Sequence, residues 1–196
     1  TWEPQYAGNF DINITMSDID REELLSKNSG LHIVTVPNGV DTHENQPLPM
    51  PTDGINKLVY VGNMSYRPNV DAVIFFCEEI LPLIRAEVPD AELWIVGKTP
   101  LPEVQALAND FVHVTGRVED VRPYYGESSV CVIPLRAGGG TRLKILESMA
   151  LGRPIVSTSI GSEGIAVKDE ETILIGDNPQ TFARQTVRLL QDKQLN

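Results

Sequence analysis

The 196-residue chain has few of the residues that build disulfide frameworks or nucleic-acid surfaces. It contains two cysteines, three histidines and 16 basic residues against 27 acidic ones. Cys77 and Cys131 fall in apolar runs, which predicts buried free thiols in a reducing compartment and no disulfide. The net charge of −11 argues against general nucleic-acid binding, because phosphate backbones are bound by clustered lysines and arginines.

Long apolar runs and metal-ligand clusters are also missing from the sequence. No apolar stretch approaches the ~20 residues that a membrane-spanning helix needs. No secretory leader is evident, although the chain does not begin with methionine. His32, His43 and His113 share no spacing with cysteines or acids, so no metal site is predicted. Ser17, Asp18 and Asp20 precede a helical pattern through Lys27 and are expected to cap it, with a metal-binding pair at Asp18 and Asp20 as the alternative.

From residue 57 onward, apolar strands alternate with amphipathic helices. Strands are predicted at 58–61, 92–96, 111–115, 130–135, 154–158 and 172–175. Helices are predicted at 69–86, 102–109, 121–126, 141–151 and 180–191. Most strands are apolar throughout, which is typical of a parallel sheet covered on both faces. The sequence therefore predicts a doubly wound, Rossmann-like α/β domain that binds ligands beyond the carboxyl ends of its strands.

The first 56 residues differ from this domain. They hold nine acids and two bases, so −7 of the net charge lies there. Residues 1–40 predict two short strands and one helix, which are too little to bury a core, so we expect them to be the remnant of another domain. Residues 41–56 predict an extended, proline-rich linker, and residues 57–196 form the α/β domain.

The most informative stretch is a glycine run between a strand and a helix, at 138–140. First helical turns favour acids because of the helix dipole, yet this helix begins with Arg142 and Lys144 and has no acid before Glu147. Glycines let backbone N–H groups approach an oxyanion, and the two cations would neutralise it. The pattern predicts a phosphate or diphosphate site. The alternative is a plain turn, with Lys144 paired to Glu147 on the surface.

Four segments resemble glycosyltransferase family 4. They are PNGVD at 37–41, VGNM at 61–64, IVG at 95–97 and, above all, GGGTRLKILESMALGRPIVST at 138–158. The chain is similar, over essentially its whole length, to the carboxy-terminal, nucleotide-sugar-binding half of a GT-B enzyme. The resemblance implies that residues 1–40 end the amino-terminal acceptor domain and that the chain is a fragment.

The resemblance implies transfer of a sugar from a nucleoside-diphosphate sugar to an acceptor hydroxyl, in polysaccharide or glycoconjugate synthesis. Such enzymes stabilise the leaving diphosphate with a helix amino terminus and basic side chains, so no metal or other cofactor is expected. We expect a cytoplasmic enzyme with no nucleic-acid partner. Any peripheral contact with the inner face of the membrane would come from the missing acceptor domain, and the fragment alone would transfer nothing.

The resemblance also assigns residues to the donor. The expected donor-binding residues are Gly62, Asn63, Gly97, Lys98, Arg117, Val118, Gly139, Gly140, Thr141, Arg142 and Glu147. Glu147 matches the glutamate that holds the ribose hydroxyls, and Gly140 and Thr141 would offer N–H groups to the diphosphate. Arg142 or Lys144 would neutralise it. The two loops that contain Gly97, Lys98, Arg117 and Val118 would flank the base through their backbones.

The residues expected nearest to the reacting bond are Lys144, Arg67 and Glu163. Arg67 would replace the basic residues that the family carries after the first strand, with a solvated loop position as the alternative. Glu163 would face the donor sugar or solvent. Gly139 stands where the family has the first glutamate of its Glu-x7-Glu motif, which leaves the sugar and the stereochemical course open.

Other functions stay open at this point. A dinucleotide-dependent oxidoreductase would share the sheet, but the first strand leads into Gly-Asn-Met-Ser at 62–65 and not into Gly-x-Gly-x-x-Gly. A sugar-nucleotide 2-epimerase would bind the same ligand and differ in its product. A non-catalytic nucleotide-binding module would bind without turnover.

Overall fold

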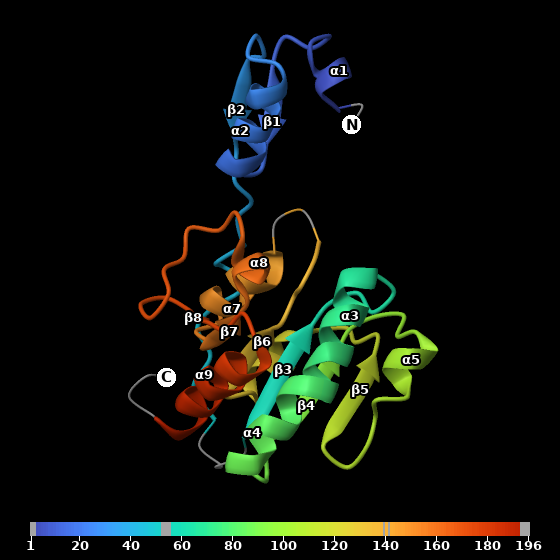
Figure 1. Ribbon diagram of the computed structural model, residues 1–196. Helices are drawn as coiled ribbons and strands as arrows, with labels where there is room; N and C mark the ends of the chain where they lie inside the picture. The colour runs from blue at the N-terminus through green and yellow to red at the C-terminus, as the bar shows by residue number, and fades with distance from the viewer. Residues whose placement is uncertain (1–2, 52–55, 139, 141, 193–196) are drawn as a thin grey trace.

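The computed structural model describes residues 3–51, 56–138, 140 and 142–192. Figure 1 shows a small amino-terminal unit and a larger α/β domain, joined by an extended segment. No helix within these described residues is long and apolar enough to cross a bilayer.

The small unit is a β-α-β arrangement preceded by a short helix. Its elements are α1 (Glu3–Ala7), β1 (Asn13–Thr15), α2 (Asp18–Lys27) and β2 (Ile33–Thr35). The two strands are parallel. The Ser17 side chain caps α2 by accepting a hydrogen bond from the Asp20 N–H, with Asp18 and Asp20 in the first turn. The capping role predicted for this segment is confirmed.

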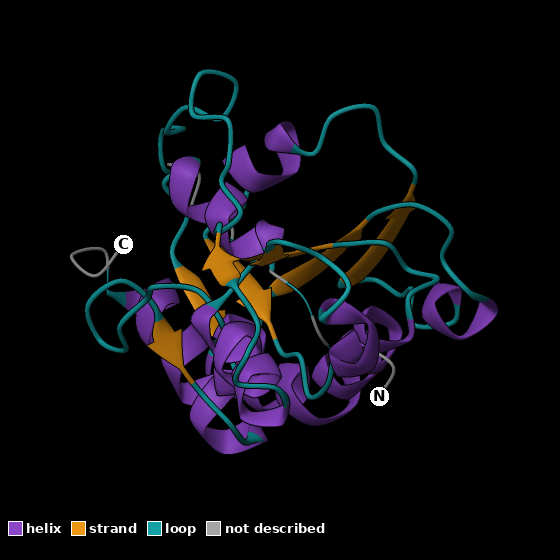
Figure 2. Ribbon diagram, turned by 90° about the horizontal axis from the view of Figure 1, so that it is seen from above, coloured by secondary structure: helices purple, strands orange, loops and turns teal. Residues whose placement is uncertain are grey.

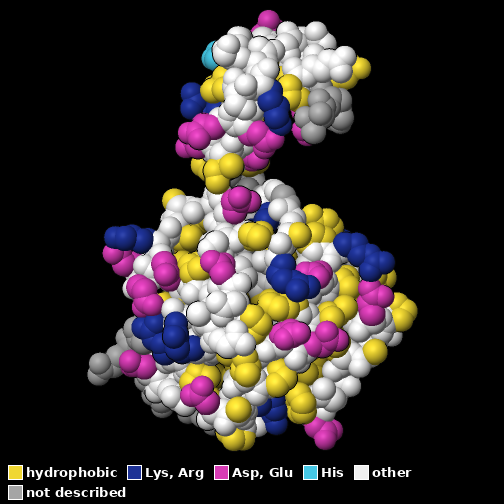
Figure 3. Space-filling view, in the orientation of Figure 1, with side chains coloured by type: hydrophobic (Ala, Val, Ile, Leu, Met, Phe, Trp, Pro, Cys, Tyr) yellow, Lys and Arg dark blue, Asp and Glu magenta, His cyan; other side chains and the backbone are white. Residues whose placement is uncertain are grey.

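One face of the small sheet is covered by its own unit and the other is open. Ala7, Leu31 and Ile33 form a cluster with side chains of α2. Alternate residues on the opposite face are exposed: Ile12, Ile14, Met16, Val34 and Val36. Apolar side chains are visible on the surface of this unit in Figure 3. A parallel strand pair is normally covered on both faces, whereas the described residues of this unit cover only one.

The described residues of the larger domain form a parallel sheet with the strand order β5-β4-β3-β6-β7-β8. The strands are β3 (Lys57–Val61), β4 (Glu92–Val96), β5 (Val112–Gly116), β6 (Val130–Ile133), β7 (Ile155–Ser157) and β8 (Leu174–Ile175). The chain builds outward from β3 to β5 and then returns to β6 on the other side of β3. This reversal between β3 and β6 is a topological switch point, where such sheets bind ligands. The predicted Rossmann-like fold is confirmed.

Helices lie on both sides of the sheet (Figure 2). They are α3 (Arg67–Phe75), the π-helical turn η1 (Phe76–Ile80), α4 (Leu81–Glu87), α5 (Pro102–Gln105), α6 (Arg122–Gly126), α7 (Leu143–Ala150), α8 (Ser159–Ser162) and α9 (Pro179–Gln191). The α9 helix packs against η1 and α4, with the rings of Phe76 and Phe182 edge to face at 5.9 Å. Strand and helix side chains together bury one continuous core.

The linker is held against the carboxyl end of α7. Gly152 has a φ of +67°, and the N–H groups of Gly152 and Arg153 bond back to Met149 O and Ser148 O at 3.0 and 2.8 Å. This is a Schellman end, in which glycine adopts the left-handed conformation. Directly beside it, the Leu48 N–H donates to Leu151 O at 3.0 Å. Leu48 in the predicted linker is therefore fixed to the domain.

Candidate functional site

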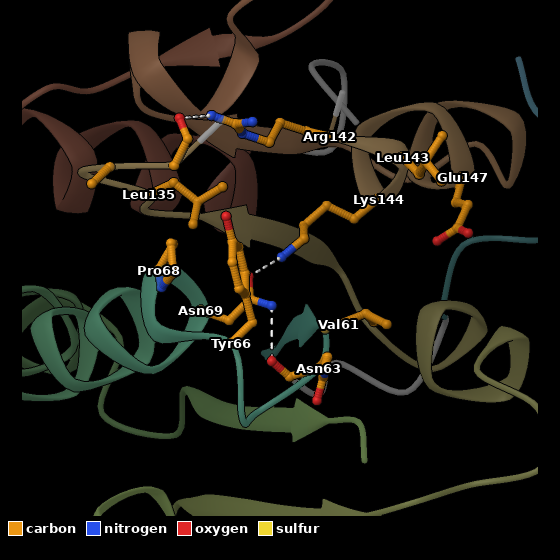
Figure 4. Close-up of a pocket in the computed structure, with 13 residues that line it drawn as sticks. Val61, Asn63, Tyr66, Pro68, Asn69, Leu135, Arg142, Leu143, Lys144 and Glu147 are labelled. Atoms are coloured by element: carbon orange, nitrogen blue, oxygen red, sulfur yellow. Dashed lines mark hydrogen bonds between the residues drawn. The ribbon is translucent and has the colours of Figure 1, made fainter. Parts of the chain in front are cut away.

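A pocket of about 280 Å³ opens at the switch point, beyond the carboxyl ends of β3 and β6. Its walls come from the loop after β3, the start of α3, the loop after β6 and the first turns of α7. Figure 4 shows the side chains of Lys144, Asn69 and Asn63 converging in it, with Glu147 at one side. The pocket therefore lies where the strand order predicts a ligand site.

Lys144 enters the pocket from the first turn of α7. Its Nζ donates to Tyr60 OH at 2.8 Å and to Asn69 Oδ1 at 3.0 Å. Burial disfavours the charged form and lowers the pKa of Lys144 to about 7. A Cβ at Gly62 would stand 2.9 Å from Asn69 Nδ2 and 3.1 Å from Lys144 Nζ. Glycine at position 62 thus leaves room for the buried ammonium.

Glu147 lies one helical turn after Lys144 and lines the same pocket. The Glu147 side chain is half-buried. Among the described residues, its carboxylate accepts no hydrogen bond and forms no ion pair. Burial raises the pKa of Glu147, and the neighbouring Lys144 charge opposes that shift. The surface pair between Lys144 and Glu147, the alternative interpretation of the sequence, does not form because the ammonium is bonded to Tyr60 and Asn69.

Arg142 organises the glycine loop. Only 7% of its surface is exposed, and its guanidinium donates to the carbonyl oxygens of Gly138 at 2.9 Å, Ile160 at 3.3 Å and Gly140. Arg142 Nε is buried and meets no acceptor in the described part of the chain. The positive charge predicted for the anion site is therefore present. Two nitrogens of the Arg142 guanidinium, however, bind backbone carbonyl oxygens.

Several predicted residues do not line this pocket. Arg67 Nη1 is 2.7 Å from Glu103 Oε1 on α5, and its side chain is 78% exposed. Arg67 is thus exposed to solvent, which is the alternative that the sequence left open for it. Gly139 and Thr141 lie outside the described residues. Among the described residues, those that do not line the pocket include Gly97, Lys98, Arg117, Val118, Gly140 and Glu163.

Gly97 packs closely against the backbone of Gly62, which lines the pocket. Its φ is +151°, and a Cβ there would come 1.7 Å from the carbonyl oxygen of Gly62. Asn63, predicted at the donor, does line the pocket, and its carbonyl oxygen accepts from Asn69 Nδ2 at 2.9 Å. Of the predicted site residues, those that line the pocket together are therefore Gly62, Asn63, Arg142, Lys144 and Glu147.

Tyr60 and Asn69 were missed by the sequence prediction. Tyr60 is 1% exposed within an otherwise apolar strand, and Asn69 is 8% exposed at the start of α3. Polar side chains in such buried segments need a hydrogen-bonding partner, and that is the signal that could have indicated them.

The chemistry of the pocket suits an anion that also carries hydroxyl groups. The Lys144 ammonium, the buried Arg142 and the amino terminus of α7 supply positive potential. The Glu147 carboxylate can accept hydrogen bonds from two neighbouring hydroxyls. A phosphorylated sugar or nucleotide satisfies both demands.

Comparison with known proteins agrees with this chemistry. The family model "Glycosyl transferases group 1" matches residues 55–192. A Klebsiella pneumoniae protein, "Uncharacterized 44.6 kDa protein in cps region", is 26% identical over 139 residues, which are 66% of this chain and 36% of that protein. The phosphatidyl-myo-inositol mannosyltransferase of Mycolicibacterium smegmatis is 25% identical over 193 residues, which are 93% of this chain and 49% of that one. The chain thus spans half or less of the length of these relatives.

A solved structure shares the fold. A mutant of S. aureus TarM, crystallised with fondaparinux, α-GlcNAc-glycerol and UDP, superimposes with a TM-score of 0.80 at 19% identity. The match covers 98% of this chain and 39% of that one. This likeness places the larger domain among the Rossmann-like halves of GT-B proteins.

Proposed function

The chain belongs to the group 1 glycosyl transferases, and on that premise we propose that it is the donor-binding part of a family 4 glycosyltransferase. The enzyme would transfer a sugar from a nucleoside-diphosphate sugar to an acceptor hydroxyl. The observation that carries the proposal is the pocket at the switch point, which joins the Lys144 ammonium and the amino terminus of α7 to the Glu147 carboxylate.

In this proposal, each group has a separate task. Lys144 and the first-turn N–H groups of α7 neutralise the diphosphate as the bond from the anomeric carbon to its oxygen breaks. Glu147 holds the ribose hydroxyls, and Arg142 holds the loop in shape through its carbonyl contacts. Because protein groups neutralise the leaving diphosphate, the proposal needs no metal ion or other cofactor. Addition of EDTA should leave nucleotide binding unchanged.

The acceptor would bind to a second domain, of which residues 1–40 are the end. The open apolar face of the β1–β2 sheet supports this, because it offers a surface for further helices. The names of the two relatives support a role in polysaccharide or glycoconjugate synthesis. The free thiols of Cys77 and Cys131 support a cytoplasmic location, with any membrane contact made by the acceptor domain.

The first test is a thermal-shift panel of UDP, GDP, ADP, dTDP and NAD on this chain. A ligand present at 100 times its Kd stabilises the native state by about 2.7 kcal/mol. A shift with one diphosphate supports the proposal and identifies the base. A shift with NAD alone would favour an oxidoreductase and contradict the proposal.

The activity itself requires the full-length protein with a labelled sugar nucleotide. Transfer of the label to an acceptor supports the proposal, whereas an epimerised nucleotide would indicate a 2-epimerase. Binding without turnover would indicate a non-catalytic module. The present chain should bind nucleotide weakly and transfer nothing, because both halves must close on the substrates.

Replacement of Glu147 by alanine is expected to weaken diphosphate binding by about 1–3 kcal/mol, the range for hydrogen bonds to charged groups. Isothermal titration calorimetry measures this change directly. The matched control is Glu87→Ala, an exposed glutamate at the last position of α4, which should bind as tightly as the wild type. Equal affinity in Glu147→Ala would remove Glu147 from the site.

A further inference from the structure

In each hydrogen bond around the Lys144 ammonium, the donor and the acceptor can be assigned in one way. Asn69 Nδ2 donates to Asn63 O at 2.9 Å, which turns the amide oxygen toward Lys144. The Tyr60 hydroxyl donates its single proton to that oxygen at 2.7 Å. Its lone pairs are then left to accept from Lys144 Nζ at 2.8 Å. Tyr60 and Asn69 together therefore present two acceptors to the ammonium.

Within the described residues, the same count leaves one donor of the ammonium without an acceptor. An ammonium has three N–H bonds, and two of them bind Tyr60 OH and Asn69 Oδ1. Nζ also lies 4.0 Å from the centre of the Tyr60 ring, which closes that side. Lys144 lines the pocket, so the open direction for the third N–H is the pocket itself.

We propose that Tyr60 and Asn69 are positioning residues that hold the Lys144 ammonium in the pocket wall with its third N–H directed at the donor diphosphate. This inference rests on the proposed function. It assigns Tyr60 and Asn69 an action through Lys144.

The arrangement couples nucleotide binding to pH. The groups that face Lys144 are the Tyr60 hydroxyl on β3, the Cys131 thiol on β6, and Arg142 and Glu147 beside it at α7. Burial is the largest influence and lowers the pKa of Lys144 to about 7. A bound diphosphate favours the ammonium and raises that pKa, so binding takes up a proton. Affinity should therefore be constant below pH 7 and fall by about tenfold per pH unit above it.

The test measures the Kd of UDP-glucose by calorimetry between pH 6 and pH 8.5, or of the corresponding sugar nucleotide if the panel selects another base. The diphosphate of a sugar nucleotide does not titrate in this range, so the pH dependence belongs to the protein. Wild type should show the loss of affinity above pH 7. Lys144→Met should bind on the order of tenfold or more weakly at pH 6, show no such dependence, and approach wild type at pH 8.5.

The positioning residues are tested by Tyr60→Phe and by Asn69→Ala, with Asn69→Ser as a second variant in case alanine prevents folding. Each removes an acceptor that stabilises the ammonium, so the midpoint of the pH profile should move below that of wild type. The control is Tyr124→Phe, a tyrosine on α6 that does not line the pocket, and its profile should match wild type.

A purely structural role of Tyr60 and Asn69 would change the affinity and leave the midpoint in place, and that result would overturn the inference. Binding by wild type with no pH dependence would also overturn it and leave the proposed function standing. Absence of binding at every pH would overturn both.

Discussion

Gly97→Ala is expected to lower the free energy of unfolding by roughly 3–5 kcal/mol, the sum of overpacking and backbone strain. The alanine Cβ would stand 1.7 Å from Gly62 O and 2.8 Å from Gly62 C. These are backbone atoms at the end of the central strand β3, so they cannot rotate away as a side chain could. The φ of +151° adds strain for any residue with a Cβ. Urea denaturation measures the change.

The matched control for Gly97→Ala is Gly116→Ala, at the end of the neighbouring strand β5. Gly116 also has a positive φ, +71°, but a Cβ there would meet no atom within 4 Å. This variant should therefore lose only about 1–2 kcal/mol from the left-handed backbone. Equal losses in the two variants would show that strain alone, and not the approach of β4 to β3, makes glycine necessary at position 97.

The strands were predictable because burial on both faces leaves a simple pattern. The stretch at 92–96 was predicted with its observed bounds, and that at 58–61 to within one residue. Hydrophobic runs report directly on burial. The ends of helices were less predictable, because they depend on single hydrogen bonds. The α7 helix begins at Leu143, two residues later than predicted, since Arg142 turns back toward the loop carbonyls.

Two further helix predictions differ from the structure in detail. The run at 69–86 was predicted as one helix and is helical throughout, but it contains the π-helical turn η1, which ends two residues before Pro82. Proline has no N–H to donate and its ring crowds the preceding turn, and a wider turn accommodates both. The helix predicted at 102–109 ends at Gln105, because the N–H groups of Leu107 and Ala108 bond to carbonyls three residues back and the Asn109 N–H bonds forward to Val112 O.

The site was predictable where its residues are close in sequence. Lys144 and Glu147 lie three positions apart, and helical spacing alone puts them on neighbouring turns of α7. Tyr60 is 84 residues and Asn69 is 75 residues from Lys144, and only the tertiary fold brings them together. Arg67 shows the same limit, because its partner Glu103 is 36 residues away.

Arg153→Met is expected to lower the free energy of unfolding by roughly 2–4 kcal/mol, because buried acceptors lose a charged donor. Arg153 is 3% exposed. Its guanidinium donates to Pro49 O at 3.0 Å, Ser128 O at 3.3 Å and also Leu48 O. Methionine keeps the aliphatic stem and removes every donor. The linker should also become sensitive to protease near residues 44–50, since its carbonyls no longer bind the domain.

The opposite result, an Arg153→Met variant that is more stable than wild type, would also have a physical basis. Burial lowers the pKa of Arg153, and among the described residues no carboxylate forms an ion pair with it. Removal of such a charge would stabilise the chain if desolvation outweighed the hydrogen bonds to carbonyls. The control, Arg184→Met on the exposed side of α9, should change stability by less than about 0.5 kcal/mol. An Arg153→Met variant as stable and as protease-resistant as that control would mean that the Leu48 N–H bond to Leu151 and local packing, and not the guanidinium, hold the linker.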